Sequence, residues 1–205
     1  AERRYRHSLA LRKEIDDPSG TASVLHNLGR LAGVQGRHSE ARRLLLESLE
    51  IYLELDEKAG IAYVRSGLAR ALTQLGRQEE ARREASLALE LALAIESRSD
   101  ILSALLTIAL LYERSGASSD AIQLAQTVEG TAKGSSEPHR AEAANLIRRL
   151  LAAQAPTAAA EGGRPREESE PRRLSAGDER FYADTDVLTT LAREELNNLR
   201  AAGDG

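Results

Sequence analysis

The chain has 205 residues, of which 41% are hydrophobic and 29% are charged, a composition typical of a water-soluble protein. It contains no cysteine, which excludes disulfide bridges and thiolate metal sites, and its longest apolar runs are too short to span a membrane. The net charge is -4 and the arginines are interleaved with glutamates, so we expect no direct binding to nucleic acid.

Residue usage also indicates a source and a compartment. The basic residues are nearly all arginine and alanine is abundant, as in proteins of high-GC bacterial genomes. No secretory signal opens the sequence, and the absence of cysteine fits a reducing environment, so we expect a cytoplasmic protein. Because Ala1 falls inside the repeat described next, we expect the natural protein to continue upstream.

Residues recur at a spacing of forty along most of the chain. The recurring residues are Gly36, Gly76 and Gly116, then Ala41, Ala81 and Ala121, and also Leu9, Leu49 and Leu89. Gly20 and Gly60 keep the same spacing, with Asp100 in the third copy. Because these registers hold together, the sequence predicts an internal repeat of about forty residues.

Within each period, apolar residues recur at intervals of three and four, which predicts two helices per unit. A glycine ends the first helix, because glycine adopts the left-handed backbone conformation without a side-chain penalty. Asp16 or Asp17, Asp56, and Ser97 or Ser99 are expected to cap the first helix of the following unit. In chain order, the predicted helices are residues 1–15, 19–35, 38–55, 58–75, 78–96, 99–115, 118–132 and 138–154.

These helical hairpins resemble the tetratricopeptide repeat. The first half of its pattern is carried by Leu25, Leu28, Gly29 and Ala32 in one unit and by Leu105, Ile108, Ala109 and Tyr112 in another. The second half is carried by Ala1 with Tyr5, Ala41 with Leu45, and Ala81 with Ala85. A small residue at Gly29, Ala69 and Ala109 is expected where the two helices of a unit cross, since a larger side chain would force them apart.

The array departs from the usual pattern in two ways. Its period is longer than the usual one of about thirty-four residues, and Leu53 and Leu93 stand where the closing proline of the pattern would fall. Both features make it similar to the long type of repeat found in kinesin light chains. The C-terminal arrays of MalT-like regulators and of bacterial signal-transducing ATPases are of the same type.

The resemblance implies an all-α fold, a tetratricopeptide-like right-handed solenoid of stacked antiparallel helix pairs. We expect residues 1–154 to form the array with a capping helix, residues 155–180 a flexible linker, and residues 181–205 a tail with one short amphipathic helix. The apolar face of this helix is Leu188, Ala192, Leu196 and Leu199. The tail helix either docks, on this array or on another protein, or is a marginal helix in a disordered tail.

No motif in the sequence indicates catalysis. The four histidines, His7, His26, His38 and His139, have no metal-ligand spacing, and the segment GTAKGSS lacks the residue order of a phosphate-binding loop. We therefore expect a protein that is not an enzyme and that holds no metal and no cofactor.

In the tetratricopeptide family, first-helix residues that face away from the packing stripe contact peptides on a concave surface. Arg30 and Arg70, one period apart, are expected to bind a carboxylate. Leu106 and Leu110 either form an apolar shelf there or belong to the core. The candidate peptide-binding residues are Ser23, His26, Asn27, Arg30, Val34, Tyr63, Ser66, Arg70, Gln74, Ser103, Leu106, Leu110 and Arg114.

The sequence therefore predicts a protein–protein interaction scaffold that binds a peptide or a partner domain on its concave face. We expect it to be the C-terminal part of a larger bacterial signalling or transcription regulator. The alternative is a ligand-sensing regulatory domain that controls an upstream nucleotide-binding ATPase module. In either case the tail helix has a possible intramolecular contact with the array.

Overall fold

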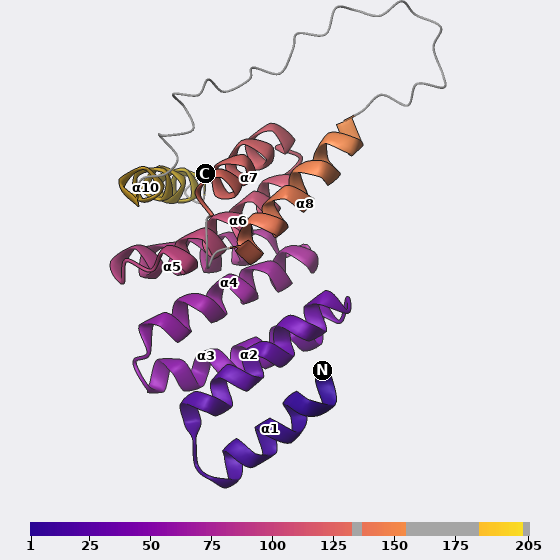
Figure 1. Cartoon of the computed structure of the whole chain (residues 1–205), viewed down its shortest axis with the longest axis vertical. Coiled ribbons are helices and arrows are strands. Elements are labelled where there is room, and N and C mark those ends of the chain that lie inside the picture. Colours follow the sequence, from indigo (N-terminus) through magenta and orange to yellow (C-terminus); the bar gives the residue numbers. More distant parts are fainter. Residues whose placement is uncertain (133–136, 155–184, 203–205) are drawn as a thin grey trace, which may run out of the picture.

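The computed structural model describes residues 1–132, 137–154 and 185–202, and helices dominate all three ranges (Figure 1). The predicted linker, residues 155–180, lies outside the described residues. The helices are α1 (Glu2–Glu14), α2 (Pro18–Val34), α3 (His38–Glu54), α4 (Lys58–Gln74), α5 (Gln78–Ala94), α6 (Arg98–Ser115), α7 (Ser118–Thr131), α8 (Glu137–Gln154) and α10 (Thr185–Ala201). No strand occurs in these ranges, so the predicted all-α class is confirmed.

The predicted helices of the array agree with the observed ones to within two residues at each end. The glycines at the turn between the two helices of a unit, Gly36, Gly76 and Gly116, have φ angles of 75°, 74° and 85°. These angles lie in the left-handed region, as predicted for residues that end a helix. The spacing of forty therefore reflects one turn conformation that the chain repeats.

The turn between consecutive units also repeats, through residues other than glycine. Asp16, Asp56 and Glu96 have φ angles of 53°, 50° and 53°. Asp17 caps α2 by accepting a hydrogen bond from the Gly20 N–H (2.8 Å), and Ser97 caps α6. The expectation that Asp56 caps α4 is wrong, because Asp56 is the left-handed turn residue and Glu57 stands at the N-cap position.

The two helices of each unit cross at a small residue, as predicted. Ala69 and Ala109 are fully buried. At Gly29, a Cβ atom would lie 2.8 Å from Cγ of Leu45 and 3.2 Å from the Ala41 carbonyl oxygen, both on α3. No side chain fits at that distance without a shift of the neighbouring helix. The close approach of the two helices therefore depends on the small residue.

The stacked hairpins form two layers. Each helix packs on the next along the chain from α1 to α8, and the contacts α2/α4, α4/α6 and α6/α8 join the first helices of successive units. We call α2, α4, α6 and α8 the helix A layer, and α1, α3, α5 and α7 the helix B layer. The array is thus a tetratricopeptide-like solenoid of stacked helix pairs.

Helix α8 continues the helix A layer. It begins about forty residues after α6, in phase with α2 and α4. On the side that packs against the array, Ala143, Leu146, Ile147 and Leu150 are buried, whereas Leu151 is half exposed. The helix expected to cap the array therefore occupies the place of a fourth helix A.

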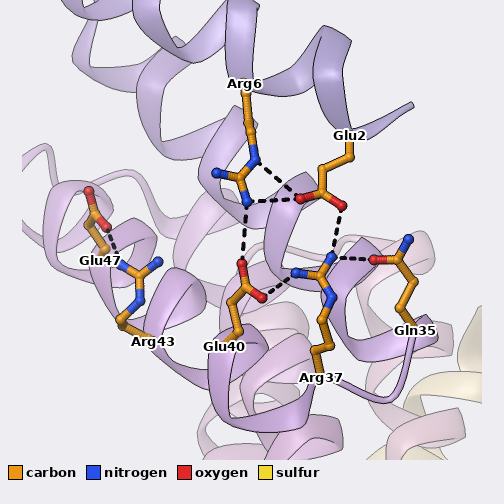
Figure 2. Close-up of polar contacts among 7 residues, drawn as sticks. All are labelled: Glu2, Arg6, Gln35, Arg37, Glu40, Arg43 and Glu47. Carbon is orange, nitrogen blue, oxygen red and sulfur yellow. Dashed lines mark hydrogen bonds and ion pairs between the residues drawn. The ribbon is translucent and has the colours of Figure 1, made fainter.

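Helix α1 has no fully buried residue, and ion pairs join it to α3 (Figure 2). At the start of α3, Nη2 of Arg37 lies 2.9 Å from Oε2 of Glu2, and the same guanidinium also pairs with Glu40. Glu40 lies 3.6 Å from Arg6, and Lys13 lies 3.5 Å from Glu47 further along the two helices. Because these charges are partly exposed, water screens them and each pair contributes little to stability.

Helix α10 lies against α5 and α6 (Figure 1). Its predicted apolar face, made of Leu188, Ala192, Leu196 and Leu199, is buried. The Tyr112 hydroxyl donates a hydrogen bond to Glu195 (2.7 Å), and Arg200 pairs with Glu90 of α5. The Arg82 guanidinium donates to the carbonyl oxygen of Ala202 (3.1 Å).

The crossing of the two helices provides a test of the fold. Replacing Ala109 by Leu adds a side chain to a fully buried position, and overpacking of this kind costs roughly 1–3 kcal/mol. We expect Ala109→Leu to lower the free energy of unfolding by that amount in urea denaturation. Ser119→Leu, on the exposed start of α7, is the control and should have little effect. Equal stability of Ala109→Leu and the parent would contradict the assignment of helix faces.

Candidate binding groove

The helix A layer contains a cavity of about 640 Å³, which we call the helix A groove. Its polar and aromatic lining comes from every helix of that layer, together with Tyr52 of α3 and Glu57 at the turn before α4. The lining residues are His26, Arg30, Tyr52, Glu57, Ala59, Gly60, Tyr63, Gly67, Arg70, Ser99, Asp100, Ser103, Pro138, His139 and Glu142.

Five of the thirteen candidate residues line this groove, namely His26, Arg30, Tyr63, Arg70 and Ser103. Two others are buried, since Ser66 is 3% and Leu106 is 1% exposed. The expectation that Leu106 forms an exposed apolar shelf is therefore wrong, and the alternative that it belongs to the core holds. Leu110 is partly buried and packs on the same core.

The remaining candidates lie outside the lining of the groove. Ser23 and Val34 are exposed, and Asn27 is partly buried. Arg114 donates a hydrogen bond to the side chain of Gln74, which joins two candidate residues one period apart.

Several residues that line the groove are not among the thirteen candidates. His139 and Glu142 belong to α8, which we had expected to be only a cap. The start of α8 in phase with the repeat is the signal that would have indicated a fourth helix A. Tyr52 comes from a helix B, whereas the candidates were sought on the first helix of each unit, and Asp100 occupies a register shared with glycines.

Arg70 is fixed in the wall of the groove. Its Nε donates a hydrogen bond to Oγ1 of Thr107 (3.0 Å), and its guanidinium pairs with Glu142 of α8. These contacts tie α4 to α6 and to α8. Arg70 therefore already has a carboxylate partner within the protein, whereas we expected it to bind a carboxylate of a ligand.

Arg30, by contrast, is exposed and forms no ion pair or side-chain hydrogen bond with the residues that the structure describes. It lies one helical turn after His26 on α2, and both residues line the groove. A guanidinium group offers paired N–H donors that match a carboxylate. Of the two predicted arginines, Arg30 is the one that is available to a ligand.

His26 is the most buried polar group of the groove, with 3% of its surface exposed. Its ring lies 4.0 Å from the ring of Tyr63, centroid to centroid, at an angle of 42°. Nδ1 is buried and has no hydrogen-bond partner. Burial, with a smaller effect of the nearby Arg30 charge, lowers the pKa of His26 from 6.5 to about 4, so the ring is neutral at pH 7.

His139 approaches the same groove from α8, and its Nδ1 is also buried without a partner. Burial is the main cause that lowers its pKa, with Glu142 opposing and Arg70 adding to the effect. Both rings therefore line the groove, and each has a buried nitrogen that no group of the described residues satisfies. Buried polar atoms of this kind are rare and commonly meet a ligand or an ordered water.

Other chemistry finds little support in the described ranges. No group of three or more histidine, aspartate or glutamate side chains there has a geometry that could hold a metal ion. None of the described helices is both long enough and apolar enough to cross a membrane. The arrangement in the groove is suited to hydrogen bonding and charge pairing.

The burial of neutral His26 predicts how stability depends on pH. The unfolded chain binds a proton at this residue below about pH 6.5, whereas the folded chain binds it only near pH 4. Above pH 6.5 His26 therefore does not reduce the free energy of unfolding. As the pH is lowered from 6.5 towards 4, this group lowers the free energy of unfolding by on the order of 3 kcal/mol.

Urea denaturation at pH 7.0 and at pH 4.5 measures this effect. We expect the wild type to lose more stability between the two values than His26→Phe, because the variant lacks the titrating ring. His7→Phe, at an exposed position of α1, is the matched control and should behave as the wild type. An equal loss in the wild type and His26→Phe would contradict a buried neutral His26.

Comparison with known proteins agrees with the repeat geometry. The family model described as Tetratricopeptide repeat matches residues 1–54, the stretch that forms α1, α2 and α3. Comparison with curated proteins gives no match to the chain. The match supports a tetratricopeptide-type repeat in this stretch. Repeats of this type generally mediate protein–protein interaction and typically form scaffolds that are not enzymes.

Proposed function

We propose that this chain is a protein interaction module whose helix A groove binds a peptide or a segment of a partner protein. One observation carries the proposal: Arg30 and His26 line the groove one helical turn apart. The guanidinium of Arg30 has no partner among the described residues, and the buried imidazole of His26 has an unsatisfied nitrogen. A ligand that bonds to both removes the cost of the unsatisfied imidazole, about 1–3 kcal/mol.

The groove is built to hold its shape. Arg70 links α4 to α6 and α8, and Arg149 of α8 makes two hydrogen bonds with Glu113 of α6, at 2.9 and 2.7 Å. A preformed wall lowers the entropy that a ligand loses on binding, because fewer protein side chains must be ordered. These contacts support a binding surface that is present before its partner arrives.

The wider context is also a proposal. We propose that the chain is the C-terminal part of a larger cytoplasmic regulator of a bacterium, involved in signalling or transcription, with no direct contact to nucleic acid. The alternative is a ligand-sensing domain that controls an upstream nucleotide-binding ATPase module. One observation favours this alternative: a cavity of about 640 Å³ is within the size range of small-molecule sites.

We further propose that the tail helix keeps its contact with the array in solution. The buried face of α10 and its bonds to Tyr112 and Glu90 support this arrangement. Tyr112 is nine residues from Ser103 on α6, which corresponds to about 180° around a helix. Because Ser103 lines the groove, the tail would lie on the opposite side of α6 and would leave the groove open.

The first functional prediction concerns Arg30. A partner is first captured from a lysate with the immobilised chain and identified by mass spectrometry, and its affinity for variants is then measured. We expect Arg30→Glu to lower the affinity for this partner at least tenfold and to leave the circular dichroism spectrum unchanged. Arg3→Glu, at an exposed position of α1, is the charge-matched control. Equal affinity of the parent and Arg30→Glu would rule out the groove as the partner site.

Arg70 is unsuitable for the same test. Arg70→Glu would place two carboxylates against each other at Glu142 and would loosen α8, so a loss of binding would have two explanations. The single Arg30 variant avoids this problem.

The second functional prediction concerns the tail. The double variant Leu188→Asp with Leu196→Asp places two charges on the buried face of α10. Because the helix can then no longer pack on the array, we expect amide exchange across residues 185–201 to become as fast as in an unfolded peptide. Asn197→Asp, on the exposed face, should retain the slow exchange of the wild type. Fast exchange in the wild type itself would show that the tail does not dock.

A further inference from the structure

The charges of the helix A groove are only partly matched within the protein. Glu142 pairs with Arg70, but the side-chain partners of the other two carboxylates are hydroxyl groups. Ser19 donates a hydrogen bond to Glu57 (2.9 Å), and Ser97 donates one to Asp100. Arg30 is the guanidinium that is left over. The groove therefore presents one available positive charge and two carboxylates that lack a cationic partner among the residues described.

These opposite charges lie in different parts of the groove. Asp100 is the third residue of α6 and Glu57 precedes the first residue of α4, so both stand where helices of the layer begin. Arg30 is the thirteenth residue of α2. Ten residues separate the third from the thirteenth position, which is about 15 Å along a helix axis. Glu57 lies level with the start of α2, because it accepts the hydrogen bond from Ser19, so a ligand that meets both regions spans a length of about that order.

The unsatisfied imidazole of His26 lies on the same wall as Arg30. A neutral imidazole has one N–H donor and one acceptor nitrogen, and either state of Nδ1 requires a partner. A peptide main chain offers both an N–H donor and a carbonyl acceptor at every residue, so it can satisfy either state. The backbone of Gly67 approaches the other ring nitrogen closely, since a Cβ atom there would lie only 3.3 Å from Nε2 of His26.

We infer that the helix A groove binds an extended peptide segment that carries charges of both signs. Its acidic side chain pairs with Arg30, its basic side chain lies against Glu57 and Asp100, and its main chain bonds to His26. At about 3.3 Å per residue, a span of about 15 Å places the two charged side chains at least about five residues apart. This inference rests on the proposed function and adds the chemistry of the ligand.

The experiment uses the full chain and a phage-displayed library of random dodecapeptides. Peptides retained by the immobilised protein are sequenced, synthesised with a fluorescent label and titrated by anisotropy. The variants are Arg30→Gln, the double variant Glu57→Gln with Asp100→Asn, and His26→Phe, with Arg3→Gln as the matched surface control. Each peptide is also made with its acidic or its basic residue replaced by glutamine or alanine.

We expect retained peptides to contain an acidic and a basic residue at least about five positions apart. Arg30→Gln should lower the affinity for these peptides about tenfold. It should not change the affinity for peptides in which the acidic residue has been replaced. The double variant Glu57→Gln with Asp100→Asn should likewise lower the affinity for these peptides, but not for peptides in which the basic residue has been replaced. His26→Phe should weaken all of these peptides, because their main chain loses its partner.

One measurement does not depend on how well a variant folds. The ¹⁵N chemical shifts of the His26 imidazole in the wild type should move when a retained peptide is added, because the ring gains a hydrogen bond. Retained peptides with charge of one sign only, or an unchanged His26 shift, would overturn the inference and leave the proposed function standing. If no peptide is retained, or no groove variant weakens binding, the proposed function fails as well.

Discussion

The close contact between the two helices of each hairpin is the constraint on which the rest of this structure depends. At Gly29, Ala69 and Ala109 the facing helix is so near that a larger side chain would force the pair apart. A hairpin closed in this way buries only one side, and its other apolar side must be covered by the next hairpin. Stacking at a fixed spacing follows from this need, and it brings helices from four units into one layer around the helix A groove.

Local signals were enough to predict the helices of the array. The left-handed glycines at 36, 76 and 116 and the caps at Asp17 and Ser97 depend on residues within one turn of each boundary, so the sequence indicates them directly. Asp56 shows the limit of such signals. An aspartate favours both an N-cap and a left-handed turn, and the choice between the two depends on where the previous helix ends.

The groove was less predictable because its contacts join residues that are far apart in the chain. Arg70 and Glu142 are 72 residues apart, and Arg70 and Thr107 are 37 apart, so no local pattern indicates that Arg70 is already paired. His26 was expected to face a ligand freely, but the ring of Tyr63, from the next unit, helps to bury it. Periodicity places a residue on a face of a helix, whereas the partner that it meets there depends on the stacking.

The helix A layer and the helix B layer are mechanically coupled, so a change of curvature involves both. They are joined at the small-residue crossings, where the close packing resists sliding of one layer past the other. Any change in the spacing of the helices in one layer would therefore require an opposite change in the other layer. Helix α6 contributes Ser103 to the groove and Tyr112 to the contact with α10. A change of curvature at α6 would consequently alter the contact between α6 and α10 as well as the lining of the groove.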